Sequence, residues 1–119
     1  MRRNHRDLDA WKEAMGLAES VYHSTRGYPV AERYGLTAQM RRAAISVPAN
    51  IAEGFARRSS KELLQFLSIA AGSLSELDTL VELSSRLGLL EDVAELSRRV
   101  DRTSGLVMGL AASIERRVR

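Results

Sequence analysis

The sequence predicts an all-α protein folded as an antiparallel up-down-up-down four-helix bundle. Apolar residues recur at spacings of three and four in four long segments, which is the period of an amphipathic helix. The 119 residues include only 2 prolines, and no segment shows the alternation of a strand. The connections between the segments are short, so consecutive helices should lie side by side in opposite directions.

The length and composition indicate one domain over residues 1–119. The chain has no cysteine, which excludes disulfides and thiolate metal sites. No apolar run approaches the ~18 residues of a membrane span. The basic N-terminus is not followed by the apolar stretch of a signal peptide. We therefore expect a soluble, cytoplasmic protein that makes no membrane contact.

The first helix is predicted at about residues 7–26. Asp7 and Asp9 suit a helix N-terminus, where carboxylates favour the helix dipole. Gly27 and Pro29 suit its end. The predicted core side of this helix consists of Leu8, Trp11, Met15, Ala18, Tyr22 and Thr25.

The segments on either side of the first helix are expected to be irregular. Residues 1–6 should form a frayed arm, as chain ends often do. Residues 28–36 form the longest connection in the chain. Its large side chains should pin it onto the bundle through Tyr28, Tyr34 and Leu36.

The second helix is predicted at about residues 37–57, with Thr37 as its N-cap. Pro48 in its interior removes the hydrogen bond to the Ala44 carbonyl and should bend the helix. Most other positions are apolar, so protein should cover this helix on most sides. A single polar stripe follows one side of it and consists of Arg42, Ser46, Asn50, Glu53 and Arg57.

The third helix is predicted at about residues 60–87. Ser59 and Glu62 form a capping box at its start, and Gly88 suits its end. Its predicted core side consists of Leu63, Leu67, Ala70, Leu74, Leu77, Val81 and Ser84. A second apolar stripe consists of Phe66, Ile69, Leu80, Leu83 and Leu87.

The fourth helix is predicted at about residues 92–117. Gly105 and Gly109 lie on one side of it and should favour close packing with a neighbour. Its predicted core side consists of Val93, Leu96, Val100, Thr103, Val107, Leu110 and Ile114.

The chain lacks the residue patterns of known catalytic and metal sites. His5 and His23 are not spaced as metal ligands. We expect no catalytic residue, no metal ion and no cofactor. An enzyme built around Asn50, Glu53 and Glu76 is the least favoured alternative. These side chains are better interpreted as a hydrogen-bond set that satisfies the carbonyl freed by the internal proline.

Two features point toward partners. The second and third helices carry more apolar surface than one bundle core needs, which predicts self-association. The net charge is +3, and arginines are grouped along the chain. The candidate contacts to nucleic acid are Arg41, Arg42, Arg57, Arg58, Arg98, Arg99 and Arg102. Alternatively, these arginines form solvated ion pairs, for example between Arg57 and Glu53, or between Arg102 and a carboxylate of the third helix.

Residues 34–81 resemble the four-helix-bundle family first met in intervening sequences of bacterial 23S rRNA genes. The resemblance extends over most of the chain through Leu8 and Trp11. It also includes Gly72, Ser73, Leu74, Glu76 and Leu77. The central pattern is met at Gln39, Arg41, Arg42, Ala43, Ser46, Pro48, Asn50, Ile51, Ala52, Glu53 and Gly54. Of these, the candidates for a structural motif are Gln39, Ser46, Pro48, Asn50, Glu53 and Gly54.

The resemblance implies a fold and an assembly rather than a reaction. Family members are antiparallel four-helix bundles that assemble as cyclic pentamers, and most have no established biochemical activity. The accessory proteins of diversity-generating retroelements are similar, and these bind nucleic acid and a reverse transcriptase. We therefore expect a non-enzymatic homopentamer that binds RNA or DNA through its arginines. The alternative is a scaffold that docks another protein and has no direct role with nucleic acid.

Overall fold

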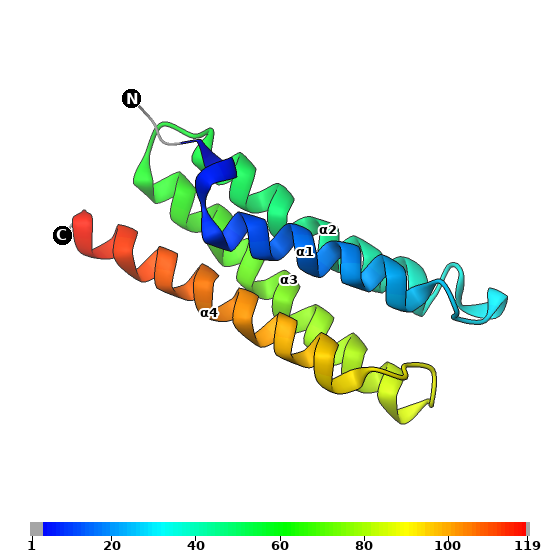
Figure 1. Ribbon diagram of the computed structural model, residues 1–119. Helices are drawn as coiled ribbons and strands as arrows, with labels where there is room; N and C mark the ends of the chain where they lie inside the picture. The colour runs from blue at the N-terminus through cyan, green and yellow to red at the C-terminus, as the bar shows by residue number, and fades with distance from the viewer. Residues whose placement is uncertain (1–3, 119) are drawn as a thin grey trace.

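The computed structural model describes residues 4–118 and contains four α-helices packed as a bundle (Figure 1). These are α1 (Asp9–Thr25), α2 (Leu36–Phe55), α3 (Ser60–Arg86) and α4 (Val93–Arg117). Figure 1 shows each helix running opposite to the one before it, with both chain ends and the α2–α3 turn at one end of the bundle. The molecule measures 47 × 22 × 20 Å. The predicted fold is confirmed.

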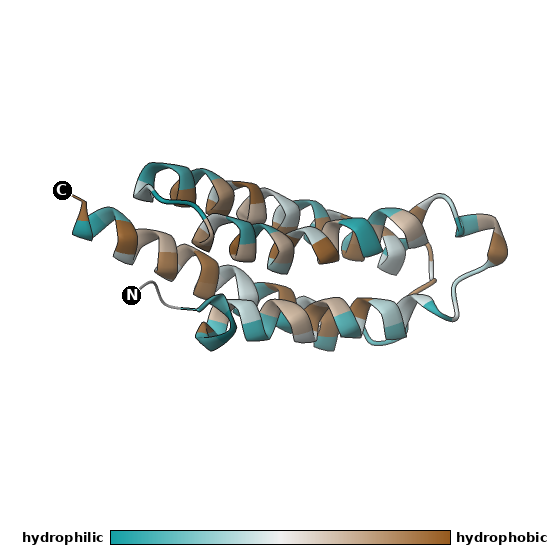
Figure 2. Ribbon diagram, turned by 90° about the horizontal axis from the view of Figure 1, so that it is seen from above, coloured by the Kyte–Doolittle hydropathy of each residue, from teal (hydrophilic) through white to brown (hydrophobic). Residues whose placement is uncertain are grey.

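One apolar core fills the space between the four helices. Each helix packs against its neighbour along the chain, and α1 closes the bundle against α4. Hydrophobic and hydrophilic positions alternate in bands along the helices (Figure 2). Burying one Leu, Ile or Val side chain contributes roughly 1.5–3 kcal/mol. The largest fully buried side chains include Leu17, Met40, Ile51, Leu67, Leu74, Leu77, Leu96 and Val100.

The boundaries of α3 are set by local signals, as predicted. At its start, Ser59 Oγ accepts a hydrogen bond from the Glu62 N–H at 3.1 Å. At its end, Gly88 adopts a φ of +72°, which glycine tolerates best. The Leu89 N–H then donates to the Ser84 carbonyl at 2.9 Å. This pattern is a Schellman motif, which satisfies carbonyls that the helix end leaves free.

The predicted core side is confirmed for α3 and α4 and wrong in part for α1, where Leu8 and Thr25 are buried as predicted but two other residues are not. Met15 is 41% exposed and Tyr22 is 38% exposed. Leu17 and Val21 occupy the core instead. Apolar residues lie on two adjacent stripes of α1, and periodicity cannot tell which stripe faces the core. The contacts with α2 and α4 decide it.

A short 3₁₀ turn, His5–Asp7, precedes α1 where a frayed arm over residues 1–6 was predicted. Asn4 Oδ1 caps this turn by accepting a hydrogen bond from the Arg6 N–H at 3.0 Å. The Arg6 guanidinium lies 5.5 Å from the centre of the Trp11 ring. The prediction is therefore wrong for the described part of the arm, and its first three residues lie outside the described residues.

The connection between α1 and α2 contains a second 3₁₀ turn, Val30–Glu32. Tyr28 and Leu36 are buried, as predicted. Tyr34 is 87% exposed and does not pin the connection onto the bundle, so that part of the prediction is wrong. Figure 1 shows this connection extending beyond the ends of the neighbouring helices.

The start of α2 lies one residue before the predicted N-cap. Gly35 takes the N-cap position, and Thr37 lies inside the helix. The Glu32 carboxylate supplies the missing acceptor, because its Oε1 accepts a hydrogen bond from the Leu36 N–H at 3.2 Å. The helix then continues through the buried Pro48 to its end.

Tyr28 buries a phenol whose oxygen has no hydrogen-bond partner among the described residues. Burial raises the pKa of this phenol, and the nearby Ser84 hydroxyl opposes the shift. Ser84 Oγ donates instead to Met40 Sδ at 3.4 Å. The hydroxyl of Tyr28 is thus a polar group that the core does not satisfy.

Tyr28→Phe should therefore leave the free energy of unfolding at pH 7 unchanged or raise it by up to about 1–3 kcal/mol. The pKa of Tyr28 is raised in the folded state, so the unfolded chain loses this proton more readily than the folded one. The free energy of unfolding of the wild type should therefore fall as the pH rises above about 10. The variant should lack this alkaline loss. Urea denaturation at pH 7 and at about pH 10.5 measures both effects. Tyr34→Phe, at an exposed site, is the matched control and should change neither value.

Candidate nucleic-acid interface

The polar stripe of α2 contains a hydrogen-bond network that joins α2 to α3. Ser73 Oγ on α3 donates to Ser46 Oγ at 2.8 Å. Asn50 Nδ2 donates to the Ser46 carbonyl at 2.7 Å and to its hydroxyl at 2.9 Å. The amide therefore serves the Ser46 carbonyl rather than the Ala44 carbonyl that Pro48 frees. The prediction that Asn50 satisfies the carbonyl freed by Pro48 is therefore wrong.

The two carboxylates of the predicted set lie apart from this network. Glu53 pairs with Arg57 at 3.5 Å on the surface of α2, as the alternative of an ion pair predicted. Glu76 is exposed on α3. These positions do not come together as a catalytic group or as a single hydrogen-bond set.

Gly54 and Gln39 mark the two ends of the α2 motif. Gly54 is buried in a tight contact between α2 and α3. A methyl group added there would lie 2.9 Å from Leu63 Cδ1 and 2.9 Å from Phe66 Cβ. Gln39 is exposed, and its N–H donates to the Gly35 carbonyl at 3.0 Å. The motif therefore includes a contact that fixes the distance between two helices.

Arg41 is a structural residue. Its Nε donates to Thr25 Oγ1 at 3.0 Å, and its guanidinium lies 4.4 Å from the centre of the Tyr22 ring. Both contacts are with α1. This arginine therefore fixes α1 against α2, and only part of its side chain remains accessible.

The three candidate arginines of α4 form ion pairs. Arg98 and Arg99 both contact the Glu95 carboxylate. Arg102 contacts Glu13 of α1 at 3.0 Å, so the predicted pairing with the third helix is wrong. Exposed pairs of this kind contribute only about 0–1 kcal/mol each. They nevertheless reduce the positive charge that this side of the molecule presents.

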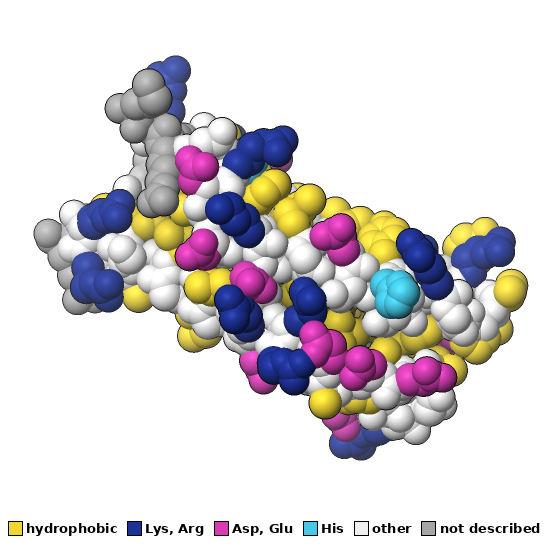
Figure 3. Space-filling view, viewed as in Figure 1, with side chains coloured by type: hydrophobic (Ala, Val, Ile, Leu, Met, Phe, Trp, Pro, Cys, Tyr) yellow, Lys and Arg dark blue, Asp and Glu magenta, His cyan; other side chains and the backbone are white. Residues whose placement is uncertain are grey.

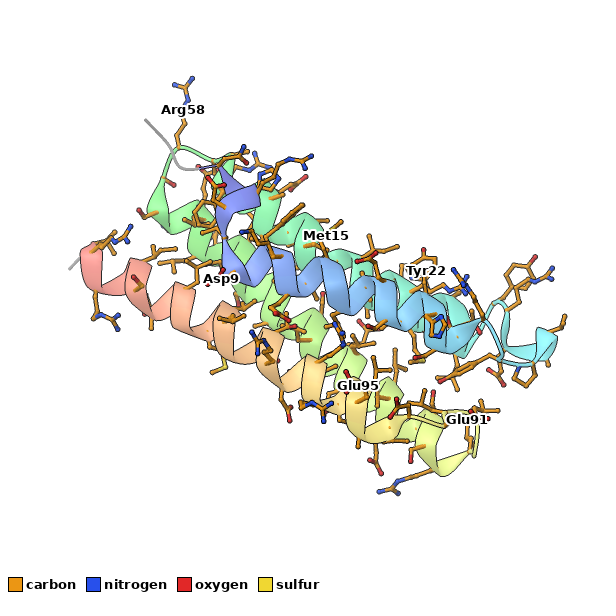
Figure 4. All side chains as sticks on the ribbon, in the orientation of Figure 1. Asp9, Met15, Tyr22, Arg58, Glu91 and Glu95 are labelled. Carbon is orange, nitrogen blue, oxygen red and sulfur yellow. The ribbon has the colours of Figure 1, made fainter. Side chains whose placement is uncertain are left out.

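The remaining candidates are Arg42, Arg57 and Arg58. Besides its pair with Glu53, Arg57 lies 4.8 Å from the centre of the Phe66 ring. Arg42 and Arg58 are exposed and make no ion pair or hydrogen bond through their side chains within residues 4–118. Arg58 extends away from the bundle in Figure 4.

The fold gathers further cations beside Arg58. Residues 4–7, 57–62 and 115–118 lie at the same end of the bundle, which we call the terminal end (Figure 1). In these segments six Lys and Arg residues outnumber three Asp and Glu residues. Dark blue side chains project around this end in Figure 3. The cations are Arg6, Arg57, Arg58, Lys61, Arg116 and Arg117.

The sequence prediction missed four of these six cations, namely Arg6, Lys61, Arg116 and Arg117. Arg116 and Arg117 can be explained locally, since cations near a helix C-terminus are favoured by the dipole. The signal that could have found them is topological. In an up-down-up-down bundle the chain ends and the middle turn share one end.

The opposite end of the bundle has a different charge character. A cleft of about 720 Å³ lies between α1 and the start of α4. In its lining the four carboxylates of Glu19, Glu91, Asp92 and Glu95 outnumber the single guanidinium of Arg99. Figure 4 shows Glu91 and Glu95 on this side. Repulsion between carboxylates and phosphates makes this cleft unsuitable for nucleic acid.

The described residues contain neither a cluster of metal ligands nor a helix that could span a membrane. Across residues 4–118, no three His, Asp or Glu side chains are grouped so that they could hold a metal ion. None of the helices in this part of the chain combines the length and the hydropathy needed to cross a membrane.

Comparison with known proteins relates the chain to a family. The model of the family described as 23S rRNA-intervening sequence protein matches residues 6–109. The match covers all of α1, α2 and α3 and most of α4. A comparison with curated proteins finds no match.

Proposed function

Because the chain belongs to the family of 23S rRNA-intervening sequence proteins, we propose that it is a non-enzymatic, cytoplasmic homo-oligomer that binds nucleic acid. The terminal end is the binding surface. The proposal rests on one observation, namely that three separate segments bring six cations to this end. Arginine forms forked contacts to phosphate, and the charge of lysine adds to them.

Assembly explains how a modest charge becomes a binding surface. One terminal end offers few phosphate contacts, and each contact contributes a small part of the affinity. A ring of parallel copies places all terminal ends on one rim. The resemblance to the family suggests five copies. The assembled mass should then be about five times the 13.2 kDa of one chain, which light scattering measures directly. A monomer at all concentrations would contradict this part of the proposal.

Arg58→Ala/Arg117→Ala should weaken the binding of RNA and DNA and make it less dependent on salt. The plot of log K against log salt has a negative slope, and each lost phosphate contact reduces its magnitude by about 1. Fluorescence anisotropy with labelled RNA and DNA, titrated from low to moderate salt, measures both quantities.

The matched control for this variant is Arg33→Ala/Arg86→Ala. It removes the same charge from exposed sites at the opposite end of the bundle and should bind as the wild type does. Equal weakening by both variants would show that only net charge matters and would contradict a binding surface at the terminal end. Absence of binding to either nucleic acid at low salt would refute the function itself.

A second candidate function is a scaffold that docks another protein. The observation that favours it is the exposed tip of the α1–α2 connection, where Val30 is 77% exposed and Tyr34 is 87% exposed. Exposed aromatic residues are common anchors at interfaces. In a pull-down treated with nuclease, Val30→Ser/Tyr34→Ser should then abolish capture of the protein partner. The same variant should bind RNA and DNA as the wild type does.

A further inference from the structure

Two groups of exposed apolar side chains follow the helices within residues 4–118, one along α1 and α2 and one along α3. This inference rests on the self-assembly proposed above and concerns which surfaces meet. The first surface, called the α1–α2 face, follows the seam between these helices and borders Arg42. The second, called the α3 face, follows the outer side of that helix. The α1–α2 face consists of the exposed Met15, Tyr22, Ile45 and Ala49, with the half-buried Ala18 between them. The α3 face consists of Ile69, Gly72, Glu76, Leu83 and Leu87.

Contacts between helices place the residues of the α1–α2 face together. Tyr22 lies on the α2 side of α1, because Arg41 packs over its ring. Met15 lies two turns earlier on the same stripe of α1, and Figure 4 shows both side chains on this side. Ile45 lies one turn after Arg41, and α2 runs opposite to α1. Its 45% exposed side chain therefore continues the same surface.

The α3 face has the spacing of a single helical stripe. Ile69, Leu83 and Leu87 are 51%, 43% and 55% exposed. Gly72 lies between them and is exposed, with no atom within 4 Å of the position a Cβ would occupy. The space above Gly72 is therefore open to an approaching helix. An approaching helix would gain from it, because glycine lets another backbone come close.

The two faces differ in shape and in charge. The α1–α2 face is bordered by the cation of Arg42, whereas the α3 face contains the carboxylate of Glu76. Neither side chain makes an ion pair or a hydrogen bond inside the described chain. Each is therefore available to a partner of opposite charge. A contact between unlike faces is heterologous, and repeating it produces a closed ring when the rotation allows.

The two unpaired charges also lie at the same height along the bundle. The hydrogen bond from Ser73 to Ser46 sets α2 and α3 side by side at those residues. Glu76 lies about one turn after Ser73, and Arg42 lies about one turn before Ser46. Since the helices are antiparallel, both steps lead in the same direction along the axis. Two copies packed in parallel can thus bring Arg42 of one beside Glu76 of the next.

We propose that the α1–α2 face of one copy docks on the α3 face of the next, with Arg42 of the first paired to Glu76 of the second. The apolar side chains of Met15 and Ile45 then pack against the stripe around Gly72 and Ile69. The second copy of this chain is the occupant of both faces. The contact leaves the terminal end free for nucleic acid.

Charge reversal tests the pairing. Arg42→Glu and Glu76→Arg should each raise the concentration needed for half-assembly by at least about tenfold, because like charges then meet across the contact. Arg42→Glu/Glu76→Arg should restore assembly to near the wild-type value. Sedimentation velocity over a range of protein concentrations measures the assembly, and circular dichroism verifies that the helices persist. Arg33→Glu, at the exposed tip, is the control and should assemble normally.

The possible outcomes separate this inference from the proposed function. If the wild type is monomeric, the proposed self-assembly fails and the contact fails with it. If the wild type assembles and either single reversal keeps its mass unchanged, only the contact is wrong. Failure of the double reversal to restore assembly, with both singles dissociated, would also overturn the pairing.

Discussion

Gly54→Ala is expected to lower the free energy of unfolding by about 1–3 kcal/mol, as overpacking of a tight contact does. This effect opposes helix propensity, which favours alanine over glycine by roughly 0.8–1.0 kcal/mol. The added methyl group would lie 2.9 Å from Phe66 Cβ, an atom that cannot move without the α3 backbone. The two helices must therefore separate.

Gly105→Ala is the matched control. Gly105 also lies inside a helix, but no atom comes within 4 Å of its added Cβ. Its substitution should raise the free energy of unfolding by about 0.5–1 kcal/mol. Urea denaturation followed by circular dichroism measures both variants, at one protein concentration because assembly would add stability. Stabilisation of the bundle by Gly54→Ala would show that α2 and α3 are not in tight contact there.

Leu77→Ala should have the largest effect of any single substitution considered, a loss of about 2–5 kcal/mol. Leu77 is fully buried in the centre of α3, and truncation would leave a cavity that neighbouring helices can only partly fill. A loss of this size is a large fraction of the total stability of a domain, which is about 5–15 kcal/mol. The variant should unfold at markedly lower urea concentration.

The comparison for this variant is Met108→Ala on α4. Met108 is 65% exposed, so its truncation should change the free energy of unfolding by no more than about 0.5 kcal/mol. The same denaturation experiment measures both variants. Similar losses for the two would mean that the core side of α3 was assigned incorrectly.

The candidate site shows where prediction from sequence stopped. Glu53 and Arg57 lie four residues apart at the end of α2, and their pairing was predictable from that spacing. The pairing of Arg102 with Glu13 joins residues of the first and last helices, so no local spacing indicates it. The packing of Arg41 on Tyr22 also joins two different helices, so no spacing within one helix indicates it. Which arginines remain accessible thus depends on contacts between helices.

The four helices, the ends of α3, and the core sides of α3 and α4 follow from the amino-acid sequence alone. These features depend on interactions within one or two helical turns, such as the Ser59 cap and the Gly88 turn. The packing of the helices sets which apolar stripe of α1 is buried, which arginines contact another helix, and which cations share the terminal end. These depend on how whole helices pack, because two similar stripes on one helix differ only in the neighbours they meet.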